Sequence, residues 1–305
     1  MQNVECSMQT ATDGPDRSPS SSDTYVGGAR PVSLPNNMKR LATSVPLILA
    51  FGACAISTQQ EVEMGTQYSQ QINAQLPIVR DAEINRYINV LGDSIARVAD
   101  DRGLSWRFFV VDSKEVNAFA VPGGYVYVNR GLIERATKMD MLAGALGHEI
   151  GHVVRRHSVK QMEAAQRANV GLTLGCILTT ICENQAAGAA INIGGSALFA
   201  KFSRDDEAQA DEVGVQYTTR AGIDPRGIPE MFRVLLDERK NNGAGVDAWF
   251  ATHPTEESRI QDTEALIARI PAATLRTLTQ DSQAYQAFRR RLLALPVTAA
   301  PRQRD

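Results

Sequence analysis

The chain has few of the residues that most often bind metals, and its charges are nearly balanced. It contains four histidines and four cysteines in 305 residues, and its 32 basic and 34 acidic side chains give a net charge of −2. The basic residues are scattered, so no patch indicates a nucleic-acid partner. No cysteine pair has metal-ligand spacing together with a second pair, so a cysteine-bound structural zinc site is not indicated.

The sequence also lacks a long apolar run; about 18 residues are needed to cross a membrane. Residues 170–200 are apolar and rich in small side chains, but their longest run, Val170–Cys182, is shorter than that. We interpret this stretch as a buried helical hairpin or a flexible insert over an active site, with membrane contact as the alternative. Cys176 and Cys182 would point to different sides of a continuous helix, so they pair only if the helix breaks between them.

The N-terminal region has the pattern of an export signal. Residues 1–37 have the composition of a disordered leader, and Met38 then opens a basic start and a short apolar run that ends in small residues before Cys54. We predict that Met38 is the true start and that residues 1–37 belong to an over-extended gene model; a translated leader is the alternative. Cys54 is a candidate for lipid attachment, which would anchor the mature protein to a membrane, and ordinary signal cleavage is the other option.

Hydrophobic periodicity predicts a mainly helical chain with a small sheet. Residues 59–101 are predicted to be helical, and three short strands are expected at 106–111, 116–121 and 125–128, with a Pro-Gly-Gly turn before the last. Further helices are predicted over residues 203–219, 225–240, 255–270 and 280–294.

The most specific motif is H-E-x-x-H, formed by His148, Glu149 and His152. It lies in a helix predicted to open with a capping box at 137–140 and to run to about residue 165. Residues four apart share one face of a helix, so both imidazoles can bind the same ion. Glu149 lies beside them and can take a proton from a bound water, which is the arrangement of a zinc peptidase.

The motif leaves room for a third ligand, because a catalytic zinc usually has three protein ligands and one open position. His157 follows His152 by five residues and would lie on roughly the opposite face of a continuous helix, so we predict that it is structural or surface-exposed. Glu207 and Asp211 are better candidates, since they are four apart. One carboxylate can bind zinc while the other accepts a hydrogen bond from a ligating imidazole; a solvated helix start is the alternative.

Several further segments, in the same order along the chain, resemble one family. They are Asn117-Ala118-Phe119-Ala120 with Pro122-Gly123-Gly124, the stretch from His148 to His157, Arg204 with Glu207 and Ala210-Asp211, Ala221-Gly222 with Asp224-Pro225, and Thr252-His253-Pro254 with Arg259. On these residues the chain resembles the CAAX-prenyl-protease-type zinc metallopeptidases (metallopeptidase family forty-eight, gluzincins), in their exported bacterial lipoprotein branch.

The resemblance implies an α+β, mainly helical, zincin-like domain over residues 56–270, with a small sheet beside the motif helix. A signal peptide over 38–55 would precede it, and a C-terminal helix and tail over 271–305 would follow. The resemblance also implies one Zn²⁺ per chain, with His148, His152 and Glu207 as ligands, Glu149 as the catalytic base and Asp211 supporting a ligating histidine.

The remaining site assignments also come from the resemblance. Asn117, Ala118 and Phe119 are expected to lie on an edge strand that holds an extended peptide through main-chain hydrogen bonds. His253 is expected near the zinc, either donating to the tetrahedral oxyanion or occupying the open position in a resting state; the alternative is a cap for the next helix. Arg259 is expected to pair with an active-site carboxylate or with the substrate backbone.

The function implied is that of a zinc endopeptidase of the bacterial cell envelope, cleaving misfolded or unassembled envelope proteins. A periplasmic enzyme anchored to the outer membrane is expected, with a soluble periplasmic form as the alternative. A chaperone-like envelope lipoprotein with a latent zinc site is the competing hypothesis. Integral-membrane members of the family carry several spanning helices, and without them the processing of prenylated peptides is not expected.

Overall fold

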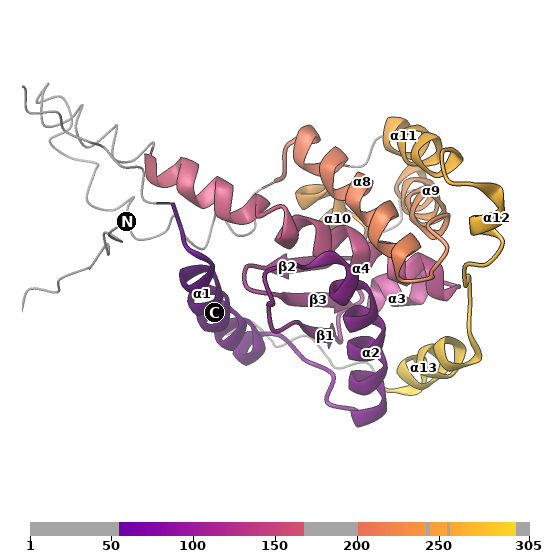
Figure 1. Cartoon of the computed structure of the whole chain (residues 1–305). Coiled ribbons are helices and arrows are strands. Elements are labelled where there is room, and N and C mark those ends of the chain that lie inside the picture. The colour runs from indigo at the N-terminus through magenta and orange to yellow at the C-terminus, as the bar shows by residue number, and fades with distance from the viewer. Residues whose placement is uncertain (1–54, 168–200, 242–244, 255–256, 297–305) are drawn as a thin grey trace, which may run out of the picture. The chain divides into compact units, whose positions relative to one another are not determined.

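A three-stranded sheet lies between helix α1 (Thr58–Gln75) on one face and helices α2 (Ala82–Ala99) and α4 (Met139–Val154) on the other (Figure 1). The computed structural model describes residues 55–167, 201–241, 245–254 and 257–296. These residues belong to one compact unit that begins at Ala55. The expectations for residues 1–54, for Cys54 and for the stretch 170–200 with its two cysteines fall outside the described residues.

The sheet has the order β1-β3-β2, so β2 lies at an edge. Strand β1 (Arg107–Val111) pairs parallel with β3 (Tyr125–Asn129), and β2 (Ala118–Val121) pairs antiparallel with β3. Side chains alternate between the two faces of a strand. Val126 and Val128 therefore join the core beneath α2 and α4, whereas Tyr127 packs with the residues of α1.

Residues 59–101 form two helices and not the single helical stretch predicted from their periodicity. Pro77 explains the break, because it disfavours helical geometry in the residue before it, and Leu76 is extended with a ψ of 147°. The Asp81 carboxylate then accepts hydrogen bonds from the backbone N–H groups of Glu83 and Ile84 and caps the start of α2.

Helix α4 differs from the prediction at both ends. The predicted capping box at Thr137–Asp140 is wrong: the N-cap residue is Lys138, and its side chain makes no capping hydrogen bond to the start of the helix. Instead, the backbone N–H of Met139 donates to Asp281 Oδ1, and that of Asp140 donates to the Gln280 carbonyl. These acceptors come from the segment before α13 (Gln283–Ala294), so a distant part of the chain caps the motif helix.

At its other end α4 stops at Val154, about ten residues earlier than predicted from the apolar pattern. Arg156 has a φ of 59°, in the left-handed region that non-glycine residues rarely adopt. Residues 157–167 then form a new helix. The chain therefore turns between the two helices, and positions on either side of Arg156 do not share the face relationships of one continuous helix.

The C-terminal half adds helices around α4. They are α8 (Arg204–Arg220), α9 (Gly227–Lys240), α10 (Asp247–Thr252), α11 (Glu257–Ala268), α12 (Ala272–Leu275) and α13, and a short α3 (Arg130–Arg135) precedes α4. α8 approaches α4 closely at Gly151, where an added Cβ would lie 2.8 Å from Val213 Cγ2 and 3.1 Å from the Ala210 carbonyl oxygen. Glycine at this position allows the two helices to pack at short distance.

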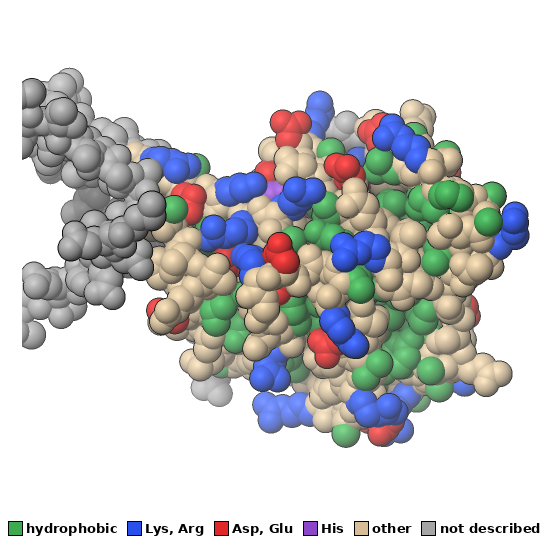
Figure 2. Space-filling view, viewed as in Figure 1, with side chains coloured by type: hydrophobic (Ala, Val, Ile, Leu, Met, Phe, Trp, Pro, Cys, Tyr) green, Lys and Arg blue, Asp and Glu red, His purple; other side chains and the backbone are tan. Residues whose placement is uncertain are grey.

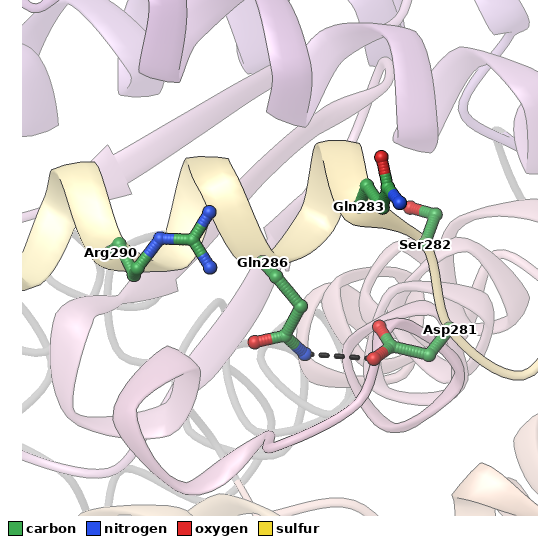
Figure 3. A pocket seen from close by; sticks show the side chains of 5 residues that line it. All are labelled: Asp281, Ser282, Gln283, Gln286 and Arg290. Carbon is green, nitrogen blue, oxygen red and sulfur yellow. Dashed lines mark hydrogen bonds between the residues drawn. The ribbon is translucent and has the colours of Figure 1, made fainter.

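The start of α13 lines an open surface pocket. Its lining residues are Asp281, Ser282, Gln283, Gln286 and Arg290, and the Gln286 side-chain amide donates to Asp281 Oδ2 at 2.9 Å (Figure 3). None of these residues belongs to the H-E-x-x-H motif or to the acidic pair on α8. The pocket therefore lies where the segment before α13 meets the start of α4, and it is separate from the motif residues.

The expectation of an α+β, mainly helical fold with a small sheet beside the motif helix is confirmed. Within the described ranges, none of the helices combines the length and the apolar character needed to cross a membrane.

Candidate active site

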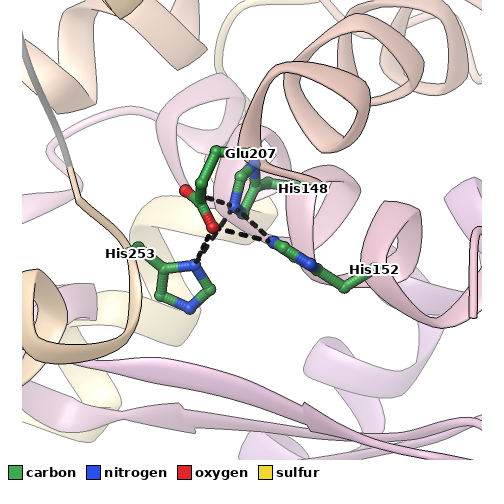
Figure 4. Close-up of side chains that lie close together, drawn as sticks. All are labelled: His148, His152, Glu207 and His253. Atoms are coloured by element: carbon green, nitrogen blue, oxygen red, sulfur yellow. Dashed lines mark hydrogen bonds and ion pairs between the residues drawn. The ribbon is translucent and has the colours of Figure 1, made fainter. Parts of the chain in front are cut away.

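Four side chains from distant parts of the chain meet at one point. His148 and His152 come from α4, Glu207 comes from the first turn of α8, and His253 follows the end of α10. Each offers one nitrogen or oxygen atom, and these atoms all lie within 4.8 Å of one another (Figure 4). All four are buried, and only a small spot of histidine surface is visible on the face shown in Figure 2.

The distances between these atoms fit a tetrahedral metal ion. A zinc ion with bonds of about 2.1 Å would place its ligand atoms about 3.4 Å apart. His148 Nε2 lies 3.0 Å from His152 Nε2 and 3.6 Å from Glu207 Oε2, and His152 Nε2 lies 3.3 Å from Glu207 Oε1. The two histidines and the carboxylate can therefore hold one such ion between them.

His253 lies at the fourth corner of this arrangement. Its Nδ1 is 3.0 Å from Glu207 Oε1 and 3.4 Å from His148 Nε2. Its other nitrogen, Nε2, is 3.3 Å from Glu149 Oε1. Burial lowers the pKa of His253, but the charges of Glu149 and Glu207 outweigh burial and hold it above its ordinary value.

The protonation of His152 and Glu207 suits metal binding. Burial lowers the pKa of His152 well below its usual range, which keeps that imidazole neutral. Burial also acts to raise the pKa of Glu207, but the neighbouring His253 and His148 outweigh it and hold that pKa well below the ordinary value. A neutral imidazole and an ionised carboxylate are the states in which these side chains bind a metal.

Glu149 lies beside the cluster and is itself fully buried. Burial raises the pKa of its carboxyl above the ordinary value, while the charges of His253 and His148 act in the opposite direction. The backbone N–H of Ala120, on edge strand β2, hydrogen-bonds this carboxyl, and Oε1 accepts no hydrogen bond from the part of the chain that is described. This oxygen, which faces His253 Nε2 at 3.3 Å, can accept a proton.

Asp211 and Arg259 lie on the other side of the cluster. Asp211 Oδ1 lies 2.9 Å from His148 Nδ1, so the ring can present Nε2 to the metal position. Arg259 donates from Nε to Asp211 Oδ2 and from Nη2 to Asp211 Oδ1, both at 2.7 Å, and from Nη1 to Glu207 Oε2 at 2.5 Å. Burial raises the pKa of Asp211, but Arg259 and His148 outweigh it and hold that pKa below the ordinary value.

His157 and Phe202 reach the site although neither was predicted to do so. His157 is only 1% exposed, and its Nδ1 lies 2.9 Å from His152 Nδ1, so the expected position on the opposite face of α4 is wrong. The turn at Arg156 explains the difference, and nothing in the sequence signals a left-handed residue there. The Phe202 ring stacks on the His152 ring with centroids 3.9 Å apart, and no motif marked it.

The predicted peptide-binding segment lies at the sheet edge next to Glu149. Phe119 stacks on Tyr127, with ring centroids 4.9 Å apart, on the face of the sheet that packs against α1. Ala118 is buried on the opposite face, and Asn117 is half-buried just before the strand. The side chain of Phe119 therefore faces away from α4, and it is the main chain of β2, through Ala120, that reaches the site.

Comparison with known proteins agrees with this geometry. The family model described as Peptidase family M48 matches residues 80–267. The chain is 32% identical to the beta-barrel assembly-enhancing protease of Escherichia coli (strain K12) over 228 residues, which is 72% of this chain and 46% of that protein. It is 26% identical to metalloprotease LoiP of the same strain over 219 residues, with coverages of 70% and 82%.

A third relative is the mitochondrial metalloendopeptidase OMA1 of Bos taurus, which is 28% identical over 175 residues, with coverages of 54% and 33%. The chain spans about half the length of the beta-barrel assembly-enhancing proteases that it matches. The family match includes the two motif histidines, both α8 carboxylates, His253 and Arg259. The resemblance inferred from the motifs is confirmed, and the chain belongs to Peptidase family M48, a family of metallopeptidases.

Proposed function

We propose that this chain is a zinc-dependent endopeptidase in which His148, His152 and Glu207 bind one Zn²⁺ and Glu149 acts as the general base. The observation that carries the proposal is the spacing of the ligand groups: the Nε2 atoms of His148 and His152 lie 3.0 Å apart, and each lies within 3.6 Å of a Glu207 carboxylate oxygen. The Glu149 carboxyl lies beside the same cluster, 3.3 Å from His253 Nε2. Two imidazole nitrogens and a carboxylate oxygen at tetrahedral spacing are a ligand set that zinc enzymes use. When bound there, zinc would polarise the scissile carbonyl and lower the pKa of a water molecule.

Glu149 would carry the proton through the reaction. Its carboxylate takes one proton from the attacking water as the new C–O bond forms, and it returns that proton to the amine nitrogen as the C–N bond breaks. Burial raises the pKa of Glu149 above its ordinary value, which makes its carboxylate a stronger base for taking the proton from water.

Asp211 and Arg259 would keep the ligands in place. A carboxylate that accepts from the Nδ1–H of a ligating histidine fixes its tautomer and ring orientation. Asp211 is positioned to do this for His148, and Arg259 compensates the charges of Asp211 and Glu207 in a buried setting.

An extended peptide substrate would bind along β2, which is the edge strand nearest Glu149. Asn117, Ala118 and Phe119 would act mainly through their main chain, since Phe119 packs against α1 and Ala118 is buried. Main-chain recognition does not depend on substrate side chains, which suits an enzyme that accepts many sequences.

We further propose that the protein works in the bacterial cell envelope on misfolded or unassembled envelope proteins. The names of the relatives support this, since one is a beta-barrel assembly-enhancing protease. The export signal after Met38 supports a periplasmic location, with lipid attachment at Cys54 to the outer membrane. A soluble periplasmic form would follow from ordinary signal cleavage.

The test is cleavage of an unfolded protein such as casein by the exported full chain, compared with Glu149→Gln. The matched control is Glu212→Gln, an exposed glutamate on the same helix as Glu207. Glu149→Gln should bind zinc with wild-type stoichiometry and lose at least about 100-fold in rate, as expected for loss of a general base. Wild-type turnover by that variant would overturn the mechanism, and a slow Glu212→Gln would show that the loss is not specific.

A chaperone-like protein with a latent zinc site is the second candidate, and the position of His253 is what favours it. A fourth protein ligand is typical of structural zinc sites, and His253 Nδ1 lies at the fourth corner of the cluster. Stoichiometric zinc with no cleavage by the wild type or by His253→Ala would support this candidate over the peptidase.

A further inference from the structure

The second motif histidine has its own hydrogen-bond partner, and that partner is another histidine. His157 Nδ1 lies 2.9 Å from His152 Nδ1, and the two rings meet edge to face with an interplanar angle of 77°. Both rings are buried, and Phe202 lies next to each of them, with centroids 3.9 Å from His152 and 6.2 Å from His157. Water is thus kept from the contact, and the hydrogen bond between the two Nδ1 atoms cannot be replaced by one to solvent.

The contact exists because the chain turns after α4. With Arg156 in the left-handed region, the helix of residues 157–167 starts in a new direction and its first residue points back at His152. The turn is itself held in place: Arg156 Nε donates to Glu61 Oε2 at 2.9 Å, and Glu61 is completely buried. The position of His157 is therefore fixed by the fold and does not depend on a flexible side chain alone.

The proton positions follow if His152 binds metal through Nε2, a step that rests on the proposed function. His152 Nδ1 must then carry the ring's hydrogen and donate it, so His157 Nδ1 must be the acceptor. The hydrogen of His157 is then on Nε2, which faces Asp206 Oδ1 at 3.6 Å, beyond hydrogen-bond distance. One tautomer of each ring therefore satisfies the contact between the two rings.

We propose that His157 is a positioning residue for the metal ligand His152. It fixes the tautomer and the ring orientation of His152, in the same way that Asp211 does for His148. The two motif histidines are thus supported by different acceptors: a carboxylate compensated by Arg259 on one side, and a neutral imidazole shielded by Phe202 on the other.

Three substitutions separate this role from simple core packing. His157→Phe keeps a planar ring but removes the acceptor. His157→Asn places an amide oxygen close to where Nδ1 is now, whereas His157→Gln places it near the position of Nε2. If the hydrogen bond to His152 matters, the Asn variant should restore what the Phe and Gln variants lose.

The experiment measures the zinc dissociation constant of the full chain and of the three variants by chelator competition, together with the thermal midpoint of the zinc-free proteins. We expect the Phe and Gln variants to bind zinc about 10–100-fold more weakly, and the Asn variant to bind within about threefold of wild type. Equal zinc affinity in all four proteins would overturn the inference. A second result would also overturn it: zinc affinity that falls in proportion to the thermal midpoint of the zinc-free variants, with no recovery in the Asn variant. That pattern is expected if position 157 matters only for packing.

The proposed function fails in a different way. If the wild type bound no zinc, or if His152→Ala bound it as tightly as wild type, the ligand assignment would be wrong. Zinc binding that depends on His152 but is indifferent to the residue at position 157 would remove only the role of His157.

Discussion

Asp211 and Arg259 form a buried bidentate ion pair directly behind the cluster of His148, His152, Glu207 and His253. Both distances, Nε to Oδ2 and Nη2 to Oδ1, are 2.7 Å, and Arg259 also reaches Glu207 and lies over the Phe232 ring, 4.5 Å from its centroid. One guanidinium therefore compensates two carboxylates that burial alone would push toward their neutral forms. This pairing links the start of α11 to the face of α8 that carries Glu207 and Asp211.

Replacing Arg259 by Met should destabilise the metal-free protein by about 3–5 kcal/mol, because two buried carboxylates would lose their compensating charge. Arg259→Lys should recover only part of this, since an ammonium group cannot make the bidentate contact. Urea unfolding of the zinc-free proteins gives the comparison. Arg233→Lys, at a half-exposed position paired with Glu264, is the control and should stay within about 0.5 kcal/mol of wild type. If Arg259→Met unfolded at the same urea concentration as wild type, the buried ion pair would contribute little to stability.

His253→Ala should weaken zinc binding, because it removes the nitrogen at the fourth corner of the cluster. The change in casein cleavage then identifies the role of the side chain. A faster rate means that His253 occupies the water position in a resting state, whereas a rate about 100–1000-fold lower means that it stabilises the oxyanion. Zinc affinity and cleavage rate that both match wild type would leave His253 without a functional role.

Gly151→Ala should separate α4 from α8. The added Cβ would lie 2.8 Å from Val213 Cγ2 and 3.1 Å from a backbone oxygen of Ala210, so the Val213 side chain must shift and the two helices are pushed slightly apart. Overpacking of this kind typically costs about 1–3 kcal/mol of unfolding free energy. Zinc affinity should fall as well, because the movement carries Glu207 away from the histidines. Gln216→Ala, at an exposed position of α8, serves as the control, and unchanged zinc binding in Gly151→Ala would mean that the interface adapts without moving Glu207.

Asp140→Asn should stabilise the protein at alkaline pH more than at acid pH. Burial raises the pKa of Asp140 to about 6, whereas the unfolded chain should titrate near 3.9. The fold favours the protonated form of Asp140. The contribution of this group to the free energy of unfolding is therefore complete below about pH 4 and is lost as the pH rises through 6. Asparagine has no charge to bury. The thermal midpoints of both proteins at pH 4.5, 6 and 8 should therefore diverge with rising pH, and a constant difference would contradict the assignment.

The sequence was sufficient for the parts of the site that lie on regular helices. His148 and His152, and likewise Glu207 and Asp211, are four residues apart, and helix geometry alone places each pair on one face. It was insufficient where a helix ends without a local signal. Arg156 adopts a left-handed conformation although it is neither glycine nor asparagine, so the continuous-helix prediction misplaced His157.

The sequence also could not predict contacts between segments that lie far apart along the chain. The Arg156 turn is bonded to Glu61, which lies 95 residues earlier, and the N-terminus of α4 is capped by residues more than 130 positions later. No spacing rule within a short window predicts either contact. Arg259 was recognised only through the family motifs, because its partners lie on a different helix.

The cap on α4 has a practical consequence for where the catalytic unit ends. The family match stops at residue 267, yet the acceptors for the first amides of the motif helix are Gln280 and Asp281. The helix that follows them also anchors itself to this region, since the Tyr285 hydroxyl donates to the Ala136 carbonyl. A protein truncated at the family boundary would leave these amides without acceptors, at a cost of about 0.5–2 kcal/mol for a lost cap. The minimal recombinant enzyme is therefore expected to need the chain through α13, some distance beyond the last residue that defines its family.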